Sequence, residues 1–239
     1  MARTASARTP LSRERVFRSA VELVDAEGLG ALTMRHLAEA LGVEAMSLYH
    51  HVPNKEGVLD GIVEVIVAEM LDAVADLDTS RAESDWAAVM RERVLAAREV
   101  LLRHPWAPDV IESRRAMIPA VVLYYEGVLA ILRRGGFSYD LAHHALHALG
   151  SRVLGFTQEL FEPDTPEGDE ANEETFRQLA EQLPNLVGML SSVSHDAADQ
   201  TLGWCDDQAE FEFGLDVLLN GLELARSRYA SRGGTDGFS

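Results

Sequence analysis

Side chains suited to nucleic-acid recognition gather in one stretch of the sequence, Thr33–Lys55. Arg35 carries a guanidinium fork, the group most often found against the O6 and N7 acceptors of guanine. Tyr49–His51 form an exposed aromatic cluster. Lys55, the only lysine of the chain, follows Asn54 at the expected start of a helix, where its charge and the free backbone N–H groups both favour a phosphate. This chemistry is that of recognition.

Two short helices must position these side chains. Thr33 can cap the first, whose apolar residues recur at three- and four-residue steps until Gly42 ends it. The segment from Glu44 to about His51 is predicted as a second helix, braced by the first because it is too short to be stable alone. Two helices joined by a tight glycine turn make a helix-turn-helix, whose second member enters a major groove. An ordinary helical hairpin is the alternative, but it leaves the cluster at Tyr49–His51 unexplained.

The run GLGALTMRHLAEALGVEAMSLYHHVPNKEGVLD resembles the DNA-binding domain of TetR-type transcriptional repressors, including its Leu-Tyr and Asn-Lys pairs. The resemblance implies a homodimer that holds a palindromic operator and is released by a small-molecule effector. It puts Arg35 where it can meet a base edge. The tetracycline repressor opens its recognition helix with Gln-Pro, whereas this chain has Ala45 and Met46, which predicts a different operator. The residues expected to bind DNA are Thr33, Arg35, Ala45, Met46, Ser47, Tyr49, His50 and Lys55.

Composition narrows the class of protein. With 239 residues, 47% of them hydrophobic, the chain can bury a sizeable core. No apolar run approaches the ~20 residues of a membrane span, and no signal-peptide pattern opens the chain. Cys205 is the only cysteine, so no intrachain disulfide can form, and no Cys and His set has zinc spacing. We therefore expect a cytoplasmic protein that does not contact membranes.

The net charge of −18 is unevenly distributed along the chain. Residues 1–60 hold 7 Lys and Arg against 8 Asp and Glu, out of 21 and 39 in the whole chain, so most of the acidic excess lies beyond them. This pattern predicts a near-neutral end that meets DNA and an acidic remainder that DNA repels. An acidic surface that only aids solubility explains the pattern equally well.

Helical periodicity without strand alternation predicts an all-α fold. Residues 1–10 are expected to be a disordered arm, 11–57 a helix-turn-helix domain, and 58–239 a helical domain for effector binding and dimerisation. The acidic stretch from Pro163 to Glu174 is typical of a mobile surface loop. Helices are expected at about 12–27, 33–42, 44–51, 54–75, 84–103, 109–117, 119–134, 139–162, 174–191 and 207–229.

Two of these helices, 139–162 and 207–229, carry apolar stripes. Two such helices per subunit can pair with their copies in a four-helix interface about a two-fold axis. The segments FEFGLDVLLNGLE, SDW, RHP and GGFS extend the resemblance to the C-terminal domain of the tetracycline-repressor subgroup. A core within one chain is the alternative origin of the stripes. The residues expected at the dimer interface are Leu149, Val153, Leu215, Leu218 and Leu222.

The same resemblance places an effector pocket in the helical body. In the tetracycline repressor a histidine on the sixth helix binds the metal, and the aligned residue here is Ile111, which offers magnesium no lone pair. We therefore expect an effector other than magnesium-tetracycline, and no metal or other cofactor. A mostly apolar ligand oriented by one or two imidazoles is expected instead, with a core role for each histidine as the alternative. The expected effector residues are Arg93, His104, Ile111, Arg114, His143, Leu146, His147 and Gly150.

Two other functions stay open from the residues alone. His143 and His147 share a helix face at i, i+4, so a two-histidine metal site, and with it a metal-dependent helical enzyme, is one of them. However, no HExxH motif, phosphate loop or nucleophile motif is present, and no catalytic residue is assigned. The other is a DNA-binding protein that responds to no ligand. Such a protein needs no hollow body, so a cavity there would count against it.

Overall fold

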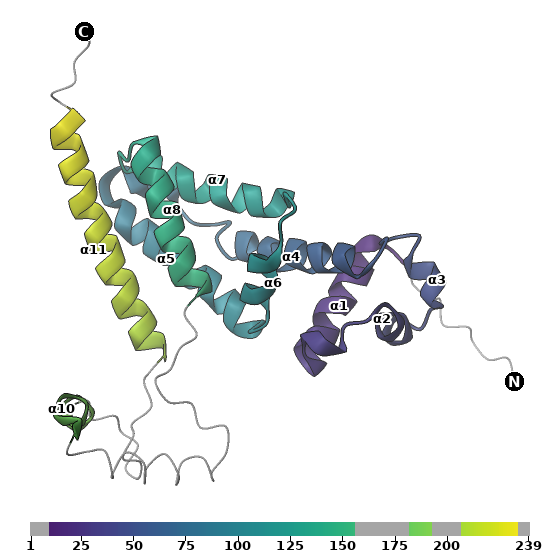
Figure 1. Ribbon diagram of the computed structural model, residues 1–239. Helices are drawn as coiled ribbons and strands as arrows, with labels where there is room; N and C mark the ends of the chain where they lie inside the picture. The colour runs from purple at the N-terminus through teal and green to yellow at the C-terminus, as the bar shows by residue number, and fades with distance from the viewer. Residues whose placement is uncertain (1–9, 156–181, 193–206, 234–239) are drawn as a thin grey trace, which may run out of the picture. The chain divides into compact units, whose positions relative to one another are not determined.

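The computed structural model describes residues 10–155, 182–192 and 207–233, and all regular structure in these ranges is helical (Figure 1). The all-α fold expected from the sequence is therefore confirmed. None of the helices described is long and apolar enough to cross a membrane. The elements are α1 (Arg13–Glu27), η1 (Leu29–Ala31), α2 (Met34–Leu41), α3 (Ala45–Leu48), α4 (Lys55–Asp72), η2 (Thr79–Arg81), α5 (Ala82–Arg103), α6 (Ala107–Ser113), α7 (Pro119–Arg134), α8 (Tyr139–Leu154), α10 (Pro184–Ser192) and α11 (Asp207–Gly233).

The chain divides into two compact units, one formed by Met1–Gly155 with Val217–Ser239 and the other by Phe156–Asp216. The first unit holds α1 to α8 and α11 from Val217 onward, and the DNA-binding surface and the cavity described below lie in it. The acidic loop predicted at Pro163–Glu174, nearly all of the predicted arm and the start predicted for the helix at 174–191 lie outside the described residues. Helix α8 ends at Leu154, with Gly155 as its C-cap, earlier than the predicted residue 162. The domain boundary between residues 57 and 58 stays a prediction.

Local capping determines where the N-terminal helices begin and end. The Ser12 hydroxyl accepts from the Arg15 N–H at 3.2 Å, and Thr33 accepts from the His36 N–H at 3.1 Å. Gly42 ends α2 in the left-handed region at φ 66°, a conformation that costs glycine little. These predicted caps are confirmed. Helix α3 is shorter than predicted: it spans only Ala45–Leu48, and the chain then continues in turns through His51.

The core of the N-terminal part lies between α1 and α4. Figure 1 shows α1, α2 and α3 gathered near the N-terminal end of α4, with α1 packed on α4 and α2 on both α1 and α3. At Gly61 the backbone of α4 lies very close to α1, because an added Cβ there would be 2.1 Å from a ring atom of Phe17. Fully buried side chains of this core include Val16, Ala20, Leu37, Leu48, Ile62 and Ile66.

Helices α5, α7 and α8 continue the first unit beyond the other end of α4. Helix α7 packs on α4, α5 and α8. Trp86 of α5 donates from Nε1 to Glu223 Oε2 of α11 at 2.7 Å, and Arg226 of α11 donates to the Gly135 carbonyl at 2.6 Å. Hydrogen bonds from Arg226 and Trp86 hold the pKa of Glu223 below its usual value. These contacts anchor the C-terminal half of α11 to the start of α5 and the end of α7.

Several helix boundaries differ from those predicted; α11, for example, continues to Gly233 instead of ending at Tyr229. Helix α4 ends at Asp72, three residues early, and the chain continues in turns. Helix α6 spans Ala107–Ser113 instead of 109–117, because Pro108 is accommodated in its first turn and Arg114 is already extended. The shift matters for function, because α6 carries three residues predicted to bind an effector on or beside it.

Candidate nucleic-acid interface and ligand cavity

The surface of α2 and α3 brings together the side chains predicted to bind DNA. Leu48 is fully buried and anchors α3, while Met46 is 72% exposed and Tyr49 and His50 also face solvent. Ala45 and Ser47 are half-buried beside them. The exposed edge of α3 therefore carries residues that can reach the major groove of DNA, as expected for the second helix of the helix-turn-helix.

Arg35 and Lys55 lie on the elements before and after α3. Arg35 extends from α2 with its side chain 88% exposed and donates from Nε to Glu39 Oε1 at 2.9 Å, one turn on. A surface pair of this kind contributes little to stability, so the guanidinium can exchange its partner for a base. Lys55 is exposed at the first residue of α4, where Asn54 caps Gly57 N–H at 2.9 Å. The DNA-binding roles of all eight residues stay predictions.

Substitutions at Arg35 and Lys55 are expected to have different effects. Arg35→Ala should weaken operator binding by about 1–3 kcal/mol and relax preference at one base pair per half-site. Lys55→Ala should weaken binding to all sequences alike and flatten the logarithmic salt dependence by about one. Selection from randomised DNA, with salt titration of the selected site, measures both effects.

Arg18 offers a matched control, because it makes the same kind of i, i+4 pair, with Glu14, on α1. Arg18→Ala should leave the selected motif unchanged. An unchanged motif for Arg35→Ala would remove Arg35 from the base-reading residues.

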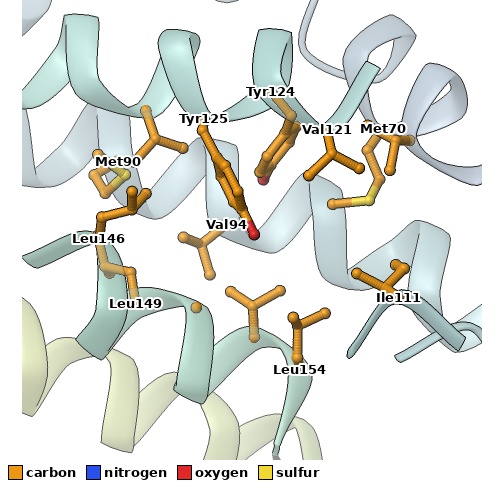
Figure 2. Close-up of a pocket in the computed structure, with 14 residues that line it drawn as sticks. Met70, Met90, Val94, Ile111, Val121, Tyr124, Tyr125, Leu146, Leu149 and Leu154 are labelled. Carbon is orange, nitrogen blue, oxygen red and sulfur yellow. The ribbon is translucent and has the colours of Figure 1, made fainter. Parts of the chain in front are cut away.

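A cavity of about 60 Å³ lies between α4, α5, α6, α7 and α8 (Figure 2). Its wall is almost wholly apolar. Figure 2 shows Tyr125 reaching into the space from α7 with its hydroxyl foremost, and Tyr124 beside it. This volume can hold a few water molecules. It is smaller than the ~300 Å³ of typical ligand pockets, so a larger ligand would have to displace residues of the wall. The lining residues are Val67, Met70, Met90, Val94, Ile111, Val121, Tyr124, Tyr125, Val128, Leu146, Leu149, Gly150, Val153 and Leu154.

The predicted effector residues divide into three groups around this cavity. Ile111, Leu146 and Gly150 line it. His143 and His147 are exposed on the outer side of α8, where their rings stack edge to face with centroids 4.7 Å apart. The remaining three, Arg93, His104 and Arg114, are not in the wall. Among the described residues no group of three or more His, Cys, Asp or Glu side chains could hold a metal ion.

The segment before α6 is tied to α1 and α4 through His104. His104 Nδ1 lies 2.8 Å from Asp25 Oδ1 of α1, and its Nε2 lies 3.4 Å from Glu69 Oε2 of α4. Trp106 Nε1 donates to the same Asp25 oxygen at 2.7 Å. His104 is buried, and these contacts occupy both ring nitrogens, so it joins helices rather than facing the cavity.

The residue after α6 is tied to the start of α4. Arg114 Nη1 donates to Glu56 Oε2 at 2.7 Å and to Asp60 Oδ1 at 3.3 Å, with its side chain largely buried. Helix α6 is thus held at both ends by helices of the DNA-binding part, while Ile111 near its middle faces the cavity. A displacement of α6 by a cavity ligand would pull on α1 and α4.

Sequence reasoning missed most of the cavity wall. Residues such as Met90, Val94 and Val128 have the spacing of ordinary core positions, which they also are in part. Tyr124 and Tyr125 offered a signal, because two adjacent phenols stand in an otherwise aliphatic helix and a buried hydroxyl needs a partner. A phenol is protonated at neutral pH, so the Tyr124 hydroxyl can donate a hydrogen bond, and burial raises the pKa of this group further.

Helix α11 presents two apolar faces. Of the predicted interface residues, Leu215 and Leu222 are buried and Leu218 is half-buried in the single chain, while Leu149 and Val153 line the cavity. A separate set of large apolar side chains on α11 faces solvent: Phe213, Val217 and Leu224. Their spacing of four and seven residues places them on one side of the helix. The interface roles of the predicted residues stay predictions.

Two family models match this chain. The model described as bacterial regulatory proteins, tetR family, matches residues 16–62, and the one described as tetracyclin repressor-like, C-terminal domain, matches residues 80–226. An HTH-type transcriptional regulator of Saccharopolyspora erythraea is 32% identical over 219 residues, covering 89% of this chain and 84% of that protein. The class C tetracycline repressor protein of Escherichia coli is 28% identical, covering 90% and 92%.

Solved structures agree with these matches. Apo ActR from Streptomyces coelicolor shares 26% identity with a TM-score of 0.73, covering 92% of this chain and 99% of that one. ActR in complex with actinorhodin shares 27% identity with a TM-score of 0.64, covering 91% and 99%. The likeness therefore extends over both the DNA-binding and the C-terminal helices.

Proposed function

This chain belongs to the TetR family of bacterial regulatory proteins, and from that premise we propose that its effector occupies the cavity beside α6. The protein is a ligand-responsive transcriptional repressor that binds operator DNA as a dimer. Because a repressor acts where operator DNA is, we also propose that this protein works in the cytoplasm. The observation that carries the proposal is that one short helix, α6, forms part of the cavity wall and is flanked by residues that contact α1 and α4.

The proposed mechanism is a shift between two distances separating the helix-turn-helix domains of the dimer. The cavity is too small for a typical effector, so binding must move its wall. Ile111 lies on α6. Of the residues flanking this helix, His104 contacts Asp25 of α1 and Arg114 donates to Glu56 of α4. A ligand that fits only when α6 has moved therefore favours the DNA-free form, because it binds that form more tightly. A DNA-binding protein without an effector would gain nothing from a cavity at this position.

A built-in side chain can test this mechanism without a known effector. Ile111→Trp should fill the cavity from α6 and imitate a bound ligand. Operator affinity should fall by about 5- to 150-fold, the usual range of allosteric coupling, while the helical circular dichroism and dimeric state are retained. Fluorescence anisotropy with labelled operator measures the effect.

The control is Glu112→Trp, on the same helix at an exposed position outside the cavity wall. It should bind operator as the unmodified protein does. Wild-type affinity in Ile111→Trp, with the tryptophan buried by fluorescence, would contradict the link from cavity to DNA.

A further inference from the structure

Arg93 is a buried cation that has no anionic partner among the described residues. Its side chain leaves α5 toward α7 and is only 4% exposed. Nη2 donates to the Tyr124 carbonyl at 3.1 Å, and Cζ lies 4.5 Å from the centroid of the Tyr124 ring. Nε has no hydrogen-bond partner. No carboxylate in the described part of the chain pairs with this guanidinium.

Four arginines elsewhere in the first unit pair with carboxylates, whereas Arg133, which likewise donates to a carbonyl and lies over a tyrosine ring, is exposed to solvent. Arg81 pairs with Glu92, Arg103 with Glu69, Arg114 with Glu56 and Asp60, and Arg226 with Glu223, all at distances of 2.6–3.3 Å. A chain with 39 acidic residues has no shortage of partners. Burial of an unpaired charge is costly unless something compensates it. The same burial lowers the pKa of Arg93, although an arginine stays charged at neutral pH.

The backbone opposite Arg93 leaves room for the guanidinium. A Cβ added at Gly127 of α7 would lie 2.7 Å from Nη2. Any side chain there would displace the fork, so this glycine keeps the position open for it. The arrangement is a built cradle for a cation, made by α7 and by the aromatic face of Tyr124.

The cradle adjoins the effector cavity. Met90 and Val94, which lie three residues before and one after Arg93 on α5, both line the cavity, as does Tyr124, on whose ring the guanidinium rests. A change in the Arg93 or Tyr124 side-chain torsions would therefore bring free N–H donors to a ligand.

We infer that the effector is an amphipathic organic acid, whose apolar body fills the cavity and whose carboxylate pairs with Arg93. This inference rests on the proposed effector cavity and adds the chemical class of its ligand. A guanidinium fork can donate two parallel hydrogen bonds to a carboxylate, and such charge-assisted bonds are about twice as strong as neutral ones. The ligand would thus supply the missing counter-charge. The Tyr125 hydroxyl, directed into the cavity, is a second hydrogen-bond donor available to a ligand there (Figure 2).

The test uses two probes of the same shape, naphthalene-2-carboxylate and its neutral analogue naphthalene-2-carboxamide. Calorimetry with the full-length protein at neutral pH measures both affinities. We expect the acid to bind about tenfold more tightly than the amide. In Arg93→Met this preference should disappear while the amide affinity stays, and in Arg93→Lys it should fall between the two, because a point charge lacks the fork. Arg81→Met, at an exposed paired arginine, should keep the full preference.

Each result bears on a different claim. Equal affinity for acid and amide in the unmodified protein, or a preference that survives in Arg93→Met, overturns the organic-acid assignment while leaving the cavity as the effector site. If neither probe binds, the effector cavity is contradicted and this inference falls with it. Should Arg93→Met fail to fold by circular dichroism, Arg93→Lys decides, since an undiminished preference there also overturns the assignment.

Discussion

A protein carrying both Val217→Glu and Leu224→Glu is expected to sediment as a monomer and to lose operator binding. The two side chains are 56% and 61% exposed in the single chain and lie seven residues apart, two turns along one side of α11. The dimer of this family needs an apolar surface on each subunit, and this is an exposed apolar stripe on a long helix. Two copies would bring four carboxylates into that seam, at a cost of several kcal/mol.

Operator affinity should fall with dimerisation, because a single helix-turn-helix domain loses the gain from linked binding at two half-sites. A loss of about a hundredfold or more is expected. Leu102→Glu on α5 inserts a charge at a comparably exposed leucine, and it should leave the dimer intact. Analytical ultracentrifugation with anisotropy on the selected operator decides. A double variant that remains dimeric would move the interface away from this side of α11.

These positions replace the more obvious leucines as probes. Leu222 is 8% exposed and Leu215 fully buried, so a glutamate at either position would disturb the packing of the chain before it reached any partner. The failure of such a variant to bind DNA would not distinguish a broken dimer from a broken fold. Val217 and Leu224 avoid this, because their side chains have little to lose within the single chain.

Gly61→Ala is expected to destabilise the protein and impair DNA binding at the contact between α1 and α4. The added methyl group would lie 2.1–2.2 Å from three ring atoms of Phe17, whose side chain is buried. Overpacking of this kind costs about 1–3 kcal/mol and sometimes more. Because α1 supports α2, a displaced α1 should carry the helix-turn-helix out of position and weaken operator binding.

Gly30→Ala is the control within the same part of the chain, since nothing lies within 4 Å of an added Cβ there. It should melt at or slightly above the wild-type temperature. Combining Gly61→Ala with Phe17→Leu should restore part of the lost stability, because the branched side chain can clear the methyl group. Thermal melting of all four proteins measures this, and a Gly61→Ala protein as stable as the unmodified one would contradict the close approach.

Neither the contact between α1 and α4 nor the face of α11 that meets a second subunit can be predicted from the sequence pattern. Gly61 stands in a helix rich in apolar residues, and nothing in that pattern shows that a phenyl ring crosses it, because the crossing point depends on how two helices pack. The apolar residues of α11 lie on more than one side. Periodicity alone could not say which side meets the chain's own core, since both sides have helical spacing.

Short-range interactions are where the sequence determined the structure by itself. The caps at Ser12 and Thr33 are satisfied by backbone N–H groups three residues on, and Gly42 ends its helix through its own left-handed conformation. The helix-turn-helix and its exposed aromatic edge follow from these local signals. The continuous sequence match over the helix-turn-helix also indicated the family, because such a match can be recognised without knowing how the helices pack.

Only the tertiary structure decided which polar side chains meet the cavity and which do not. His143 and His147 share a helix face, as their spacing predicts, but the rotation of α8 turns that face outward. His104 was expected beside a ligand and instead joins Asp25 to Glu69, across 79 and 35 residues of sequence. The role proposed for Arg93 depends on its neighbours in the described residues, which are a carbonyl, an aromatic ring and a glycine of α7 and include no carboxylate partner. Such surroundings depend on helix rotation and on partners distant in the chain, and local sequence encodes neither.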